Sequence, residues 1–188
     1  MRPQDNLQLL HAFPTSLRTE ALQAIAVLPE NPHGVGNFTV RIDDEAVSIP
    51  KRVYHDTALI RTDRLTSVQK PLVDCILTRH RDGFVRQDCL ARIVSSNHAW
   101  IPPFVIQLLG EYVIDILRVI EANLGNLDKA LYTRFLHVNP DFFALTEQRV
   151  ISYWDCYYRF SCQKEDYPGF RAVRFFKALI KDDGSRPH

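Results

Sequence analysis

The sequence has little net charge, few cysteines and few glycines, and each shortage narrows the range of functions. Lysine and arginine number 23 against 22 acidic residues, so no global positive field attracts nucleic acid or an anionic membrane surface. The 4 cysteines include no C-x-x-C pair of the kind that structural zinc sites use, and we expect neither a metal nor a cofactor. No G-x-S-x-G motif and no glycine-rich phosphate loop occurs. The common signatures of hydrolases and nucleotide-binding proteins are therefore missing.

The start of the chain, MRPQDNLQLLHAF, lacks the apolar run that a secretory signal requires. A protein that is not exported stays in a reducing compartment. We therefore expect a cytoplasmic protein whose four thiols remain free: Cys75, Cys89, Cys156 and Cys162.

The length and composition suit one ordinary folded domain. The chain has 188 residues, of which 46% are hydrophobic and 24% charged. No segment is rich enough in proline, glycine or serine to act as a linker between domains. We expect a single domain over residues 1–181, with an N-terminal helix and hairpin in 1–64, a helical body in 65–181 and a disordered tail at 182–188.

The longest apolar segment, residues 102–124, predicts a central helix. Its side chains are apolar around most of the helical circumference, which is typical of a helix buried on most sides. The length would suit a bilayer, but Glu111, Asp115 and Arg118 would each cost about 2.5–3.5 kcal/mol in the middle of a membrane. We therefore predict a core helix and no membrane span.

Upstream, Phe38, Val40 and Ile42 alternate with polar residues, and the alternation resumes after Asp43-Asp44-Glu45. This pattern predicts a β-hairpin over about 37–54. Residues 66–69 have the form of a capping box, and the chain after about residue 65 reads as successive helices. The predicted fold is mostly α, an irregular multi-helix bundle around a central buried helix with a small N-terminal β-hairpin.

Weak catalytic candidates lie near the hairpin. His55 stands beside Asp56, and His33 lies in a loop rich in glycine and proline. Acid–base catalysis needs such groups to converge in space, which adjacency in the sequence does not establish. An enzyme with a site near His55 is accordingly the third of our hypotheses.

Two short helices joined by a tight turn over residues 67–95 have the outline of a helix-turn-helix. In that interpretation Arg86, Gln87 and Arg92 would face the major groove of DNA, where arginine and glutamine suit guanine and adenine edges. Antiparallel helices with a short turn are also common in all-α folds. A DNA-binding regulator is therefore the second hypothesis.

The last third of the chain is rich in aromatic residues. Helical spacing predicts that Val150, Trp154 and Tyr157 face inward along one helix. The two final helices cannot bury every aromatic side chain, and exposed aromatics are typical anchors of protein interfaces. We therefore predict a self-association or partner-binding surface built from a set of aromatic residues: Tyr153, Phe160, Phe175 or Phe176.

Two resemblances accompany these patterns. Asp82, Val85, Arg86, Cys89 and Ile93 have the spacing of the second helix of HEAT-type repeats, over residues 82–93 only. The stretches LTRHRDGFVRQ, FVIQLLGEYVIDIL and RVISYWDCYYR resemble a family of bacterial proteins of no assigned activity. The resemblance implies no catalytic or binding residue. Our first hypothesis is a protein-interaction or regulatory module without its own catalytic activity.

Overall fold

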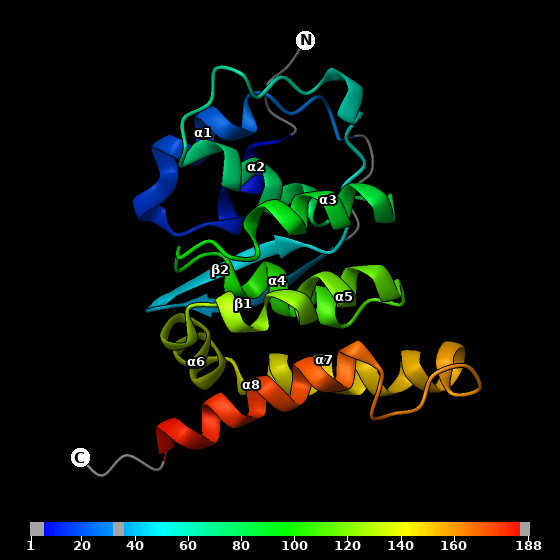
Figure 1. Ribbon diagram of the computed structural model, residues 1–188. Coiled ribbons are helices and arrows are strands. Elements are labelled where there is room, and N and C mark those ends of the chain that lie inside the picture. The colour runs from blue at the N-terminus through cyan, green and yellow to red at the C-terminus, as the bar shows by residue number, and fades with distance from the viewer. Residues whose placement is uncertain (1–5, 32–35, 185–188) are drawn as a thin grey trace. The chain divides into compact units, whose positions relative to one another are not determined.

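The computed structural model describes residues 6–31 and 36–184, with side chains up to residue 182 (Figure 1). The chain forms two compact units, Met1–Ile93 and Val94–His188, here called the N-terminal and C-terminal units. Helices dominate, and the strands described form one antiparallel hairpin near the N-terminus. The predicted mostly α fold with a small hairpin is confirmed. The expectation of one domain over residues 1–181 stays a prediction.

The N-terminal unit begins with short helical turns and then a short helix. The elements are the 3₁₀ turns η1 (Leu7–Ala12) and η2 (Thr15–Leu17), followed by α1 (Arg18–Ile25). Ala21, Ala24 and Ile25 form the buried side of α1. This helix packs against α2 (Gln69–Leu77), and the buried amide of Gln69 donates hydrogen bonds to Glu20 and Gln23.

The hairpin consists of β1 (Asn37–Ile42) and β2 (Glu45–Pro50), paired from Asn37 opposite Pro50 to Ile42 opposite Glu45. One face carries the buried residues of both strands, as the alternation predicts: Val40, Ile42, Val47 and Ile49. The turn places Asp43 at φ 50°, a left-handed conformation that aspartate tolerates better than most residues. The hairpin ends at Pro50, earlier than predicted.

Thr66 and Gln69 form the reciprocal hydrogen bonds of a capping box, and the regular helix α2 begins only at Gln69. The amide N–H of Thr66 donates to Gln69 Oε1 over 3.0 Å, and the amide N–H of Gln69 donates to Thr66 Oγ1 over 3.2 Å. After α2 the chain turns into α3 (Gly83–Ile93). His80, in that turn, forms an isolated parallel bridge with Val53, which follows the hairpin.

In the C-terminal unit the predicted helix over 102–124 is interrupted. The structure has α4 (Pro102–Leu109) and α5 (Ile114–Asn123), with a non-helical break at 110–113. Every residue of α4 is buried, so the predicted central helix is right in character but too long. A Cβ added to Gly110 would lie 2.9 Å from Arg149 Cδ and 3.2 Å from Arg149 Cβ. The backbone at 110 thus lies directly against the helix that carries Arg149, an approach that an ordinary side chain at 110 would prevent.

The remaining helices of the C-terminal unit are α6 (Lys129–Val138), α7 (Pro140–Tyr153) and α8 (Pro168–Gly184), with the 3₁₀ turn η4 (Leu124–Asn126) after α5. Helix α8 packs against α5 and α6. Residues 182–184, predicted as part of a disordered tail, belong to α8, and the rest of that tail lies outside the described residues. Within the described part of the chain, no helix is both long and apolar enough to cross a bilayer.

Candidate functional site

An exposed group of tyrosines lies on the C-terminal unit, where α7 passes into a π-helical turn, Trp154–Tyr158. The ring centroid of Tyr112 lies 6.1 Å from that of Tyr153 and 6.0 Å from that of Tyr157. The centroids of Tyr153 and Tyr157 are 6.1 Å apart, and those of Tyr157 and Tyr158 are 6.5 Å apart. Such distances are typical of interacting aromatic pairs. We call Tyr112, Tyr153, Tyr157 and Tyr158 the tyrosine cluster.

Two departures from regular helix bring the cluster together. The π-helical turn is closed by a hydrogen bond of 2.9 Å from the amide N–H of Arg159 to the carbonyl of Trp154. Tyr112 comes from the break between α4 and α5, and its carbonyl accepts a hydrogen bond of 2.7 Å from the Tyr158 hydroxyl. This bond fastens the break to the turn. Such π-helical turns are frequent at functional sites.

The cluster faces solvent. Tyr157 is 63% exposed and Tyr112 is 50% exposed, while Tyr153 and Tyr158 are half-buried. A tyrosine ring offers apolar contact area, and its hydroxyl both donates and accepts hydrogen bonds. Beside the cluster in the sequence, Arg159 forms an ion pair of 3.2 Å with Asp155. Aromatic residues and arginine are among the residue types that are enriched at protein interfaces.

The predicted partner-binding residues have different positions. Tyr153 belongs to the cluster, Phe160 is 92% exposed, and Phe175 is half-buried. Of the two alternatives on α8, Phe176 is not accessible to a partner, because its ring is fully buried 5.4 Å from the ring of Tyr132. Phe176 follows the buried residues Ala172 and Val173 at helical spacing, on the side of α8 that packs against its neighbours.

Sequence reasoning missed three members of the cluster: Tyr112, Tyr157 and Tyr158. Tyr112 was placed inside an uninterrupted helix, although Gly110 in that apolar run was an available sign of a break. Tyr157 was predicted to face inward, and it is exposed instead. Val150 is buried, as the predicted inward face requires. The wider π-helical turn then shifts the following side chains around the helix axis, so Trp154 is only half-buried.

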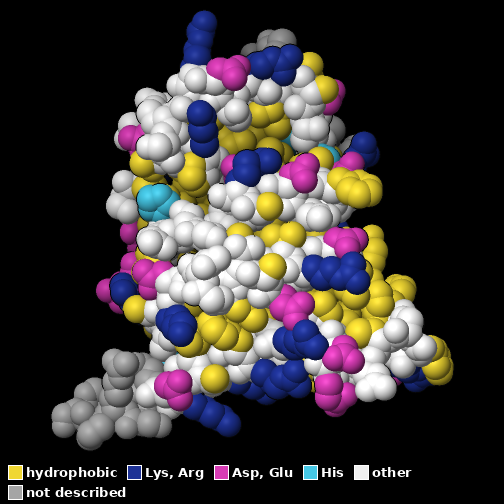
Figure 2. All heavy atoms as spheres, viewed as in Figure 1, with side chains coloured by type: hydrophobic (Ala, Val, Ile, Leu, Met, Phe, Trp, Pro, Cys, Tyr) yellow, Lys and Arg dark blue, Asp and Glu magenta, His cyan; other side chains and the backbone are white. Residues whose placement is uncertain are grey.

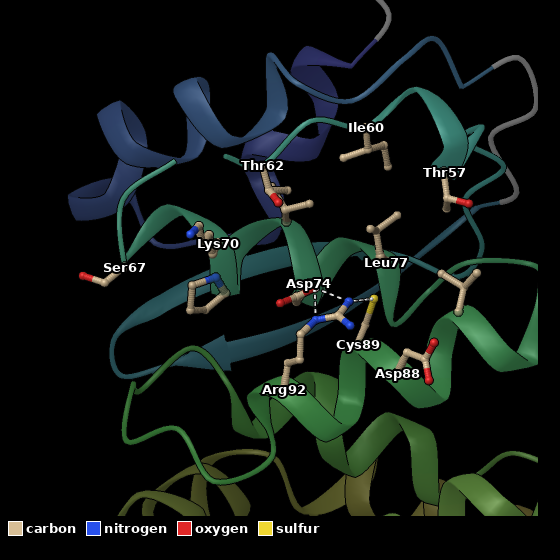
Figure 3. Close-up of a pocket in the computed structure, with 13 residues that line it drawn as sticks. Thr57, Ile60, Thr62, Ser67, Lys70, Asp74, Leu77, Asp88, Cys89 and Arg92 are labelled. Atoms are coloured by element: carbon tan, nitrogen blue, oxygen red, sulfur yellow. Dashed lines mark hydrogen bonds and ion pairs between the residues drawn. The ribbon is translucent and has the colours of Figure 1, made fainter. Parts of the chain in front are cut away.

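The N-terminal unit contains a pocket of about 720 Å³ between α2, α3 and the segment over residues 57–67 (Figure 3). Its lining comes from all three parts: Thr57, Ile60, Thr62, Ser67, Lys70, Pro71, Val73, Asp74, Leu77, Val85, Asp88, Cys89 and Arg92. At the centre, Arg92 Nε and Nη2 donate to Asp74 Oδ1 over 3.0 and 2.7 Å. We call it the α2–α3 pocket.

A cysteine lines this pocket, but its environment opposes nucleophilic chemistry. Cys89 is buried, and its Sγ lies 3.0 Å from Arg92 Nη2. Burial raises the pKa of the Cys89 thiol, and the nearby Asp74 carboxylate raises that pKa further. The hydrogen bond to Asp74 also raises the pKa of the Arg92 guanidinium. Because the thiolate is the reactive form of cysteine, Cys89 is not an activated nucleophile.

The predicted DNA-reading residues do not form one accessible face. Arg86 is buried, and its Nη1 donates to the carbonyls of His80 and Arg81 over 2.8 and 2.9 Å. Its guanidinium therefore stabilises the turn between α2 and α3 and is unavailable to a base edge. Gln87 is half-buried, and Arg92 holds the ion pair with Asp74. The role in DNA binding that was predicted for Arg86 is not compatible with this placement.

The histidine candidates are likewise dispersed. His33 lies outside the described residues. His55 is buried, with Nδ1 donating to the carbonyl of Pro29 over 2.8 Å, and its burial lowers the pKa of the ring. Asp56 is exposed and accepts a hydrogen bond from the amide N–H of Ala58, so it caps the short 3₁₀ turn η3 (Thr57–Leu59). His55 is not part of the pocket lining.

Among the described residues, no group of three or more histidine, cysteine or acidic side chains is placed to hold a metal ion. No protein-family model, no curated protein and no solved structure matches the chain. The tyrosine cluster and the α2–α3 pocket are therefore judged on their own geometry.

Proposed function

We propose that the protein is an interaction module that binds another protein chain through the tyrosine cluster, and that a second copy of the same chain is one such partner. The observation that carries this proposal is the solvent exposure of Tyr112 and Tyr157 within a set of mutually contacting rings. Aromatic residues of this kind are enriched at protein interfaces and among the residues that dominate binding energy.

The chemistry of the cluster suits pairing with a second copy. A two-fold interface brings the same surface together from both chains, so that surface must complement itself. Phenol hydroxyls donate and accept, and ring faces attract ring edges, so tyrosines meet both conditions. The nearby Asp155–Arg159 pair contributes both signs of charge. No catalytic step is assigned to the module, in line with the burial of His55 and the raised pKa of the Cys89 thiol.

The experiment is multi-angle light scattering over a concentration series, with the wild-type protein and Tyr157→Ala. We expect wild type to form a dimer at high concentration. Loss of a central aromatic anchor weakens such an interface by roughly tenfold or more, because hot-spot residues are commonly worth about 2 kcal/mol. Tyr112→Ala should act in the same direction.

The matched control is Phe84→Ala, which removes another exposed aromatic ring, at the start of α3 in the N-terminal unit. Its association should equal that of wild type. A wild-type protein that stays monomeric up to the highest soluble concentration would refute pairing with a second copy. Equal weakening by Tyr157→Ala and Phe84→Ala would show that association does not use the cluster.

A further inference from the structure

The α2–α3 pocket is an independent feature that the tyrosine cluster does not explain. Its floor is apolar, since Val73, Leu77 and Cys89 are buried and line it. Figure 2 shows the corresponding hydrophobic hollow on the face of the N-terminal unit, with basic and acidic side chains along its margins. An apolar floor with a few charged groups at the rim is the usual construction of a binding site.

The charges of the pocket are separated along its length. Helices α2 and α3 pack together and run in opposite directions, as the labelled residues in Figure 3 show, and the Asp74–Arg92 ion pair joins them. Lys70 precedes Asp74 by four residues on α2, and Asp88 precedes Arg92 by four residues on α3. Because the helices run in opposite directions, Lys70 and Asp88 lie on opposite sides of the ion pair. At about 1.5 Å per residue, they are roughly 12 Å apart along the helix axes.

The charged side chains at the two ends of the pocket are accessible to a ligand. In the part of the chain that the structure describes, neither Lys70 nor Asp88 takes part in an ion pair, and both are exposed. The labelled side chains in Figure 3 show Lys70 and Ser67 toward one end, Asp88 toward the other, and Asp74, Cys89 and Arg92 between them. Thr57, Thr62 and Ser67 add hydroxyl groups along the wall that the segment over residues 57–67 forms.

This arrangement selects among ligand classes. Two lysine or arginine cations and two carboxylates line the pocket, so a nucleotide or another polyanion would meet as much repulsion as attraction. The carboxylate of a simple fatty acid would pair with Lys70, but such a ligand carries no cation to pair with Asp88. A ligand with opposite charges at its two ends and an apolar group between them satisfies the whole lining.

We propose that the α2–α3 pocket binds an extended peptide segment of the pattern acid-x-apolar-x-base, with its acidic side chain at Lys70 and its basic side chain at Asp88. In an extended chain, residues i, i+2 and i+4 point to the same side, and the first and last are about 13 Å apart at 3.3 Å per residue. That span matches the separation of the two charged ends. The middle side chain then lies on the apolar floor, and the threonine and serine hydroxyls face the peptide backbone.

The test measures fluorescence anisotropy at low salt with labelled nine-residue peptides that carry a central five-residue core between Gly-Ser flanks. The mixed probe has the core Glu-Ser-Leu-Ser-Lys. The comparison probes replace Lys by Glu, Glu by Lys, or Leu by Ser. Because exposed charge pairs are individually weak, we expect the wild-type protein to prefer the mixed probe by roughly fivefold over either probe with like charges. The probe without leucine should bind still more weakly.

Two charge reversals make the prediction directional. Lys70→Glu should transfer the preference to the probe with two lysines, and Asp88→Lys should transfer it to the probe with two glutamates. The matched controls, Lys51→Glu and Asp63→Lys, reverse exposed charges that do not line the pocket, and they should leave the order of the probes unchanged.

Three outcomes would overturn the proposal. The first is no binding of the mixed probe by wild type. The second is an order of preference that neither Lys70→Glu nor Asp88→Lys changes. The third is equal binding of a probe with one spacer serine removed, because that spacing puts the two charges on opposite sides of the peptide. None of these outcomes bears on the tyrosine cluster, whose own test uses association of the full chain.

Discussion

Replacing Phe176 with alanine should destabilise the C-terminal unit far more than replacing Phe160. Phe176 is fully buried, with its ring 5.4 Å from that of Tyr132, 6.4 Å from that of Phe143 and 5.5 Å from that of Phe175. Burial of a phenylalanine side chain is worth about 1.5–3 kcal/mol, and truncation also leaves a cavity. The free energy of unfolding should fall by about 3–5 kcal/mol.

Phe160 provides the contrast within the same unit. Its side chain is 92% exposed, so almost no transfer free energy is lost on truncation. The Arg159 guanidinium lies 4.5 Å from its ring centroid, an exposed cation–π contact worth about 0.5–1 kcal/mol. Phe160→Ala should therefore change stability by no more than about 1 kcal/mol.

The assay is urea unfolding followed by tryptophan fluorescence. The chain has 2 tryptophans, Trp100 and Trp154, and both belong to the C-terminal unit, so this signal reports on that unit. If Phe176→Ala proves too unstable to purify, Phe176→Leu keeps most of the volume and should cost less than about 2 kcal/mol. Equal losses for Phe160→Ala and Phe176→Ala would refute the assignment of one ring to the core and the other to the surface.

Four further predictions follow from the geometry. Burial lowers the pKa of His55 below its unfolded value of about 6.5, so the stability that the neutral ring contributes is complete above that pH and declines as the pH falls below it. Urea midpoints at pH 8 and pH 5, followed by circular dichroism because His55 belongs to the N-terminal unit, should differ less in His55→Gln than in wild type. Gly110→Ala places a Cβ against Arg149 and should lower the melting temperature, with a loss of roughly 1–3 kcal/mol that Gly110→Ala/Arg149→Ala recovers in part. A thiol reagent should modify the exposed Cys156 quickly, whereas Cys89 should react only after unfolding, and equal rates in the folded protein would contradict its burial. Duplex DNA should bind weakly and without sequence preference at physiological salt, and nanomolar affinity in a salt titration would contradict this expectation.

The sequence predicted those elements whose signals are local. The capping box depends on side chains three residues apart, and the Thr66 and Gln69 bonds form as expected. The hairpin follows from strict alternation, which leaves one side of β1 and β2 buried. Both signals are complete within a few residues, so no knowledge of the rest of the chain was needed.

The errors arise where distant segments decide the local geometry. The run over 102–124 has the composition of one helix, and the contact of Gly110 with Arg149 accompanies the break in it. The π-helical turn has no recognised sequence signal, and it reverses the direction predicted for Tyr157. Phe175 and Phe176 are adjacent and chemically identical, so only the packing of α8 shows which one is buried.

The α2–α3 pocket could not be found from the sequence for the same reason. Lys70, Asp88 and the hydroxyl groups of residues 57–67 come from three segments, and only their assembly puts opposite charges at the two ends of an apolar floor. Arg86 illustrates the converse, since the helix-turn-helix interpretation placed its side chain toward the major groove of DNA while its carbonyl partners hold it inside.

The isolated bridge between Val53 and His80 ties the segment after the hairpin to the turn between α2 and α3. The amide N–H of Val53 donates to the carbonyl of Arg79, and the amide N–H of Arg81 donates to the carbonyl of Val53, each over 3.0 Å. Neither amide belongs to a helix or a strand that could fray on its own, so solvent deuterons reach them only when these two distant segments separate. Their exchange rates thus record the separation of the segment after the hairpin from the α2–α3 turn, while the amides of a local element such as α1 record its own fluctuations.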